Sequence, residues 1–315
     1  MQLLHSYSPS PILTTLGALT LYWYGFFYAV SIALGYWLIS RTLRRQSQTN
    51  DPNLRAWSLQ LTAILPDLAL ALVVVGLAGA RLYHVLNEPT YYFSHPLYIF
   101  AFWRGGLAIH GALVADILFL WWYTQRLPST SEVGGTFFRA RTIGPQTEKL
   151  SRRHNTIFLF LLDLLAPAML LGQAIGRWGN YFNQELFGKP TNLPWGIPID
   201  LAHRPLGFEA YTYFHPTFLY ESLWDLIGAI ILLSWQYQSS KLINPPDRRL
   251  TARPGFIFFT YLAYMALGRL LVEYLRIDTT PIVGLRLPAD VSILIIGIGI
   301  WGFVSLTLKN QSSIL

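Results

Sequence analysis

Long apolar stretches separated by shorter polar segments dominate the pattern of the chain. A helix needs about 20 mainly apolar residues to cross a bilayer core about 30 Å thick. Seven stretches meet this requirement, namely residues 17–40, 61–86, 106–124, 156–178, 216–236, 255–276 and 289–308. The pattern therefore predicts an all-α integral membrane protein with seven transmembrane helices, which form a single polytopic membrane domain over residues 1–315.

Basic residues gather in alternate segments between these stretches. Residues 41–57, 124–156 and 238–254, together with Lys309, hold 15 of the 23 Lys and Arg residues, whereas the first 16 residues hold none. The positive-inside rule then predicts an extracytoplasmic N-terminus and a cytoplasmic C-terminus. The net charge of +7 is explained by this orientation and by contact with anionic lipid, so we expect no nucleic-acid partner.

Two polar segments differ in character. Residues 129–155 are polar and contain Gly, which predicts a cytoplasmic loop without a catalytic role. Residues 179–215 contain Asn180, Asn183 and Glu185 and several prolines, which predicts a small ordered extracytoplasmic cap.

Composition agrees with a lipid environment and limits the chemistry. Charged residues make up 12% of the chain, whereas a soluble domain has about 25%. Because the chain has no cysteine, a disulfide, a thiolate metal site and a cysteine nucleophile are excluded, and any thiol must arrive with a substrate. No HExxH or comparable spacing appears, so we expect no metal site.

Charged residues within or at the ends of apolar spans are the first candidate functional groups. A charge near the bilayer centre costs at least about 2.5 to 3.5 kcal/mol, so it usually faces a cavity or a partner. Arg177 ends the fourth span, and Arg269, Glu273 and Arg276 form a stripe along the sixth. These side chains either form a buried ion-pair network or hold a phosphate with two guanidinium forks. Snorkelling to the outer headgroups is the alternative for Arg81 and Arg276.

Other polar side chains at membrane depth leave two interpretations open. Glu221 and Asp225, four residues apart in the fifth span, are interpreted as partners of arginines or neighbouring helices rather than as reacting groups, and so is Asp163. His110 is either a structural group or a functional one. Tyr24 is either a member of an interfacial aromatic belt or a functional residue.

Five motifs resemble those of the prolipoprotein diacylglyceryl transferase family of bacterial inner membranes. In chain order they are YWYG, RGGLAIHG, GRWGNYFNQELFG, HPTFLYE and GRLLVEYLR. The resemblance extends over essentially the whole chain. It implies transfer of the diacylglyceryl group of phosphatidylglycerol to the lipobox cysteine thiol of a prolipoprotein signal peptide, with a thioether formed and glycerol phosphate released. It also implies a multi-pass protein of the bacterial plasma (inner) membrane that contacts membrane lipids and needs no cofactor.

The resemblance further implies which residues form the site. The catalytic candidates are His110, Tyr24, Arg269 and Asn180. The substrate-binding candidates are Arg177, Arg269, Asn183, Glu185, Gly188, Glu273 and Arg276. Within this set the two arginines Arg177 and Arg269 are the headgroup ligands. Either His110 takes the thiol proton, or the field of the arginines alone lowers the pKa of the thiol.

Two positions depart from the family's pattern. Ala112 stands where the family has the second Gly of HGG, and Met265 stands where it often has a tyrosine, for which Tyr264 and Tyr261 are the candidate substitutes. The alternative function is a lipid or anion transporter that uses the same arginines as a binding site. A third is a structural scaffold whose buried charges only fasten helices together.

Overall fold

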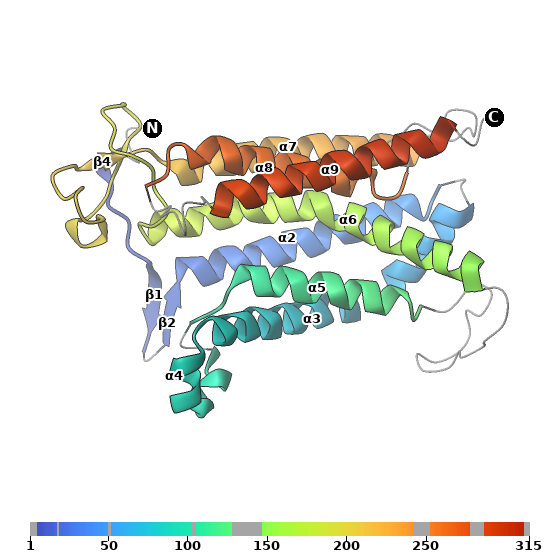
Figure 1. Ribbon diagram of the computed structural model, residues 1–315, viewed down its shortest axis with the longest axis horizontal. Coiled ribbons are helices and arrows are strands. Elements are labelled where there is room, and N and C mark those ends of the chain that lie inside the picture. The colour runs from blue at the N-terminus through green and yellow to red at the C-terminus, as the bar shows by residue number, and fades with distance from the viewer. Residues whose placement is uncertain are drawn as a thin grey trace. The chain divides into compact units, whose positions relative to one another are not determined.

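The computed structural model of the chain is mostly helical (Figure 1). It describes residues 5–17, 19–49, 52–102, 105–127, 147–241, 253–277 and 287–311. Among these residues, six helices are long and apolar enough to cross a membrane. They are α2 (Trp23–Gln46), α3 (Pro52–Asn87), α6 (Thr147–Phe182), α7 (Thr217–Lys241), α8 (Phe256–Glu273) and α9 (Leu287–Gln311). The prediction of a helical integral membrane protein is confirmed at this level.

The predicted span over 106–124 corresponds to a shorter helix, α5 (Ile109–Thr124), which has 16 residues. At about 1.5 Å per residue this helix extends about 24 Å, less than the bilayer core of about 30 Å. Six of the seven predicted spans therefore have the length of a transmembrane helix.

The described residues also form two small sheets that an all-α prediction does not include. Strands β1 (Ile12–Leu16) and β2 (Leu19–Tyr22) form an antiparallel hairpin, so α2 begins six residues later than the predicted start at residue 17. The Leu and Thr residues of this hairpin suit strands, and Gly17, at the turn between β1 and β2, has a φ of +63°. Strands β3 (Ile197–Pro198) and β4 (Tyr213–Phe214) pair within the predicted cap.

Helix α6 is longer than predicted at both ends. It begins at Thr147, so residues 147–155 are helical although they were predicted as part of a loop, while residues 128–146 lie outside the described part of the chain. It ends at Phe182, so the first four residues of the predicted cap belong to this helix.

Contacts divide the chain into two compact units, which we call the first unit (1–42 and 162–315) and the second unit (43–161). In the first unit α6 contacts three other helices. The Ser31 hydroxyl of α2 donates to Gly172 of α6 at 3.3 Å, and the Ser222 hydroxyl of α7 donates to Ala174 at 2.8 Å. The buried core between α6, α7 and α8 consists of Ala166, Leu170, Ala229, Leu232, Phe256, Ile257 and Tyr261.

A buried carboxylate joins α6 to the start of α8. Asp163 accepts the backbone N–H groups of Gly255 and Phe258, each at 2.7 Å. Gly255 is the N-cap of α8, has a φ of +97° and provides no side-chain cap. Asp163 therefore satisfies N–H groups that have no partner within their own helix, which confirms its interpretation as a partner of a neighbouring helix.

The second unit contains α3, α5, and the short helices α4 (Pro89–Ser94) and η1 (Pro96–Phe100). Glycines let α3 and α5 approach closely, since a Cβ added to Gly111 would lie 2.2 Å from the carbonyl oxygen of Gly79.

Arg81 of α3 fastens the segment between α4 and α5. Its guanidinium donates to the carbonyl oxygens of Ile99 at 2.9 Å and Gly105 at 2.6 Å, and also to those of Tyr98 and Gly106. Only 4% of Arg81 is exposed. The snorkelling interpretation of Arg81 is therefore wrong, because its charge is enclosed by backbone carbonyls instead of lipid headgroups.

Candidate active site

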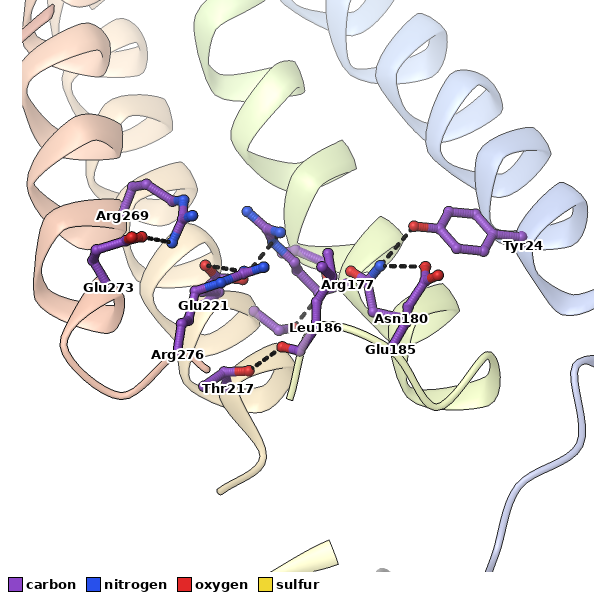
Figure 2. A network of polar contacts seen from close by, with 12 residues as sticks. Tyr24, Arg177, Asn180, Glu185, Leu186, Thr217, Glu221, Arg269, Glu273 and Arg276 are labelled. Carbon is purple, nitrogen blue, oxygen red and sulfur yellow. Dashed lines mark hydrogen bonds and ion pairs between the residues drawn. The ribbon is translucent and has the colours of Figure 1, made fainter. Parts of the chain in front are cut away.

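Three arginines and two glutamates of the first unit form one network (Figure 2). Arg177, near the end of α6, lies 3.0 Å from Glu221 of α7, measured between Nη1 and Oε2. The other carboxylate oxygen of Glu221 lies 3.9 Å from Nη1 of Arg276, which follows α8. Arg269 of α8 lies 2.7 Å from Glu273 in the same helix. Glu221 therefore joins two arginines from different helices, as interpreted from the sequence.

The side chains of this network differ in how far they are exposed to solvent. The side chains of Glu221, Glu273 and Arg276 are each 5% exposed, whereas those of Arg177 and Arg269 are 26% and 22% exposed. Snorkelling of Arg276 is therefore wrong. The buried acids hold the two arginines in place from one side, and part of each guanidinium side chain stays accessible on the other.

The arginines of this network lie within electrostatic range of one another. Arg269 is within electrostatic range of Arg177, Arg276 and Glu221, and Figure 2 shows the three guanidinium groups directed toward one region. The three arginines exceed the two glutamates by one positive charge, and a third acid, the buried Asp225 of α7, also lies within electrostatic range of Arg177. The ion-pair network that the sequence allowed is thus present, and the side chains of Arg177 and Arg269 remain partly exposed.

A second polar cluster lies one turn further along α6. The Asn180 side-chain amide donates to the Tyr24 hydroxyl at 2.7 Å and to the Glu185 carboxylate at 2.9 Å. Asn180 is 4% exposed, and a Cβ added to Gly179 would lie 3.0 Å from the Tyr24 ring. Tyr24 is therefore fixed by a specific bond to α6, which a residue of an interfacial belt would not need.

Gly188 contributes through its backbone. It forms an isolated antiparallel bridge with Arg276, and a Cβ there would lie 2.8 Å from Cβ of His215 and 3.0 Å from the carbonyl oxygen of Leu275. Its lack of a side chain thus lets the segment with Arg276 approach. Burial and the charge of Lys189 lower the pKa of His215.

The structure also describes contacts of two further candidates, His110 and Asn183. His110 lies in the first turn of α5 in the second unit, where its ring centroid is 6.1 Å from that of Tyr83. The backbone N–H of Asn183 donates to Gly179 at 3.0 Å. Within the described residues no group of three or more His, Asp or Glu side chains is placed to hold a metal ion.

The two tyrosines near Met265 make contacts between helices. The Tyr264 hydroxyl donates to the carbonyl of Trp224 at 2.8 Å, and the Tyr261 hydroxyl accepts from Gln173 at 3.1 Å. Met265 itself packs against the core of the first unit.

Sequence reasoning missed two residues, Gln184 in the segment after α6 and Thr217 at the start of α7. The Thr217 hydroxyl donates to the carbonyl of Leu186, and the buried Gln184 adopts a φ of +52°. Neither residue carries a charge or ring that would single it out in an apolar chain.

Comparison with known proteins identifies similar chains over nearly the full length. A family model described as prolipoprotein diacylglyceryl transferase matches residues 11–144 and 147–305. A phosphatidylglycerol–prolipoprotein diacylglyceryl transferase of Synechocystis sp. is 40% identical over 97% of this chain and 92% of its own length. The proteins of the same name from Nostoc sp. and Prochlorococcus marinus are 38% and 33% identical, over 96% and 97% of this chain and 92% and 95% of their own lengths.

Proposed function

Because the chain belongs to the prolipoprotein diacylglyceryl transferase family, we infer which of its side chains act in the transfer of a diacylglyceryl group from phosphatidylglycerol to a prolipoprotein. The chain is a transferase of lipoprotein maturation. The acceptor is the thiol of a lipobox cysteine in the signal peptide, and the chain's own lack of cysteine means that no internal thiol competes with it.

The reaction requires stabilisation of a leaving phosphate. The sulfur attacks the glycerol carbon that carries the phosphate ester, a C–S bond forms, and the C–O bond to the phosphate breaks. Glycerol phosphate leaves with the electron pair of the broken bond, so negative charge grows on its oxygen. We assign Arg177 and Arg269 to the phosphate, because both are partly exposed and both are oriented by buried glutamates. This is the observation that carries the proposal.

The second polar cluster suits the glycerol headgroup. Tyr24, Asn180 and Glu185 offer a phenol, an amide and a carboxylate, which together donate to and accept from hydroxyl groups. Asn180 lies three residues after Arg177, hence on the same face of α6. Headgroup hydroxyls bound at this cluster would place the adjacent phosphate toward the arginines.

The thiol must lose its proton before or during attack. A free cysteine has a pKa of about 8.5, so only a small fraction is thiolate at neutral pH. His110 is the candidate base, and the alternative is that the positive field of the arginines lowers the pKa of the thiol without it. No cofactor enters this scheme.

We propose a topology with α5 as a seventh span, an extracytoplasmic N-terminus and a cytoplasmic C-terminus in the bacterial inner membrane. The distribution of basic residues supports this orientation. In this topology the segment after α6, with β3 and β4, forms the extracytoplasmic cap, and the arginines face the outer leaflet.

Transfer by purified protein tests the site. Phosphatidylglycerol labelled in its acyl chains is incubated with a lipobox peptide, and a peptide with serine in place of cysteine is the control. Arg177→Ala and Arg269→Ala should each lower the rate about 100- to 1000-fold while the protein still inserts. Unchanged transfer in both variants would refute the assignment. If His110→Gln keeps the wild-type rate and pH profile, His110 is not the base.

A further inference from the structure

The turn that follows α6 has an unusual backbone. Gln184 and Leu186 have φ values of +52° and +54°, which lie in the left-handed region that residues with a side chain seldom adopt. Such conformations persist where the surrounding structure holds them. Glu185, a residue of the second polar cluster, lies between them in the chain.

The side chain of Gln184 is what holds the first of these residues. Its amide nitrogen donates to the Asp200 carboxylate at 2.7 Å, to the Pro9 carbonyl at 2.9 Å and to the Ser8 hydroxyl at 3.4 Å. Its amide oxygen accepts the backbone N–H of Asp200 at 2.7 Å. Gln184 is 4% exposed, whereas Ser8 and Asp200 are exposed, and every polar atom of the amide is used.

The partners of Gln184 are tied together as well. The Ser8 hydroxyl donates to the other carboxylate oxygen of Asp200 at 2.6 Å. In the N-terminal segment that contains Ser8, the ring of His5 stacks on Tyr213 of β4 with centroids 4.1 Å apart. We call the group of Ser8, Pro9, Gln184 and Asp200 the clasp. It joins the segment before β1 and the segment after β3 to the turn at the end of α6.

The clasp acts on the residue next to it. The Glu185 N–H donates to the Asn180 carbonyl at 3.0 Å, and the Glu185 carboxylate accepts from the Asn180 amide. This arrangement requires the chain to reverse its direction at Gln184. The backbone N–H of Gln184 donates to the Tyr181 carbonyl at 3.1 Å, and this bond belongs to the same turn. Glycine would adopt the same φ without strain, but it has no amide to join the other two segments.

We propose that Gln184 is a positioning residue of the transfer reaction: through the clasp it holds the turn that presents Glu185 to Asn180 and Tyr24. This inference rests on the proposed function. It adds that the segment before β1, although far from the arginines in sequence, determines the geometry of the headgroup site.

The test compares two replacements of Gln184. In Gln184→Gly the backbone can still adopt the conformation of the turn, but the side-chain bonds of the clasp are lost. In Gln184→Glu the side chain keeps its size and shape, but its carboxylate lies against that of Asp200. A misplaced catalytic group lowers the rate by about 10- to 100-fold, and we expect this fall in kcat for both variants. The apparent KM for phosphatidylglycerol should change less than kcat, because Arg177 and Arg269, which bind the phosphate in the proposed function, are unaltered. Adding Asp200→Asn to Gln184→Glu should recover part of the lost kcat, since the new amide can donate to the new carboxylate.

Arg204→Ala is the matched control. Arg204 donates to the carbonyls of Ile199 and Glu209 at 2.8 Å each. Its loss loosens the same part of the chain and removes a charge near Asp200, but it leaves every hydrogen bond of the clasp in place, so kcat should stay near wild type. Wild-type kcat in both Gln184 variants would overturn the inference. So would an equal fall of kcat in Arg204→Ala, or a fall that only follows a lower melting temperature. Activity lost in Arg177→Ala but kept in Gln184→Gly would overturn this inference alone and leave the proposed function standing.

Discussion

Replacing Arg177 with lysine separates the charge of the site from its shape. The guanidinium of Arg177 pairs with Glu221 through one nitrogen, at 3.0 Å, and its side chain is 26% exposed. Its remaining N–H donors can therefore reach a phosphate while the first stays on the glutamate. A lysine ammonium is a single point of charge, and Glu221 would hold it on the buried side.

The expected loss follows from the hydrogen bonds that lysine cannot make. A hydrogen bond to a charged group contributes about 1.5 to 3 kcal/mol. Losing one such bond in the transition state lowers the rate about 10- to 150-fold. The fall should appear in kcat, because the negative charge on the phosphate grows as the C–O bond breaks.

Vesicles of phosphatidylglycerol with labelled acyl chains, purified protein and a lipobox peptide supply the assay, and the lipopeptide product is quantified. Arg41→Lys is the matched control, since Arg41 is exposed and lies over the Trp37 ring at 5.2 Å. Its rate should equal that of the wild type. If Arg177→Lys retains full kcat, the fork geometry has no part in the reaction; an equal loss in Arg41→Lys would instead point to a general effect on the membrane domain.

Three further predictions concern the surroundings of the site. Asn180→Asp places a carboxylate against Glu185 and removes an N–H donor, so kcat in the same assay should fall about 10- to 100-fold; an active variant would exclude the need for the amide. Asp163→Ala leaves two buried N–H groups of α8 without an acceptor, which should lower the free energy of unfolding by about 2 to 6 kcal/mol. Thermal unfolding in detergent tests this loss of stability, and an unchanged melting temperature of Asp163→Ala would contradict it. Hydrogen bonds from Ser8 and from the clasp amide hold the pKa of Asp200 below its ordinary value. Its stabilising effect is therefore complete above the unfolded pKa of about 3.9 and is lost as the pH falls through the folded pKa, so proteolysis of the N-terminal segment should accelerate in acid in the wild type but not in Asp200→Asn.

Hydropathy predicted the long spans well because few charges interrupt them. It could not place the start of α2, since the residues of β2, Leu19–Tyr22, are as apolar as a helix and only their pairing with β1 makes them a strand. It also began α6 nine residues too late, at 156 instead of Thr147. The segment 147–155 is polar, and polarity marks the edge of a membrane rather than the end of a helix.

The sequence indicated that Glu221 pairs with arginines, but it did not indicate the partners of Tyr24 or Arg81. The bond between Tyr24 and Asn180 joins residues 156 positions apart, and nothing in either local sequence specifies the other. Arg81 was misread because its partners are carbonyl groups, which every residue has and no sequence pattern distinguishes.

The bond between α6 and α8 also constrains how the protein is made. Asp163 and Gly255 are 92 residues apart, so at about 5 to 20 residues per second a ribosome reaches the second about 5 to 20 s after the first. During that interval the nascent chain carries an acid whose final partners have not been synthesised. The bond between Asp163 and the start of α8 therefore forms only after α8 has been synthesised, and integration of the last two helices completes a step that the third of the six long helices began.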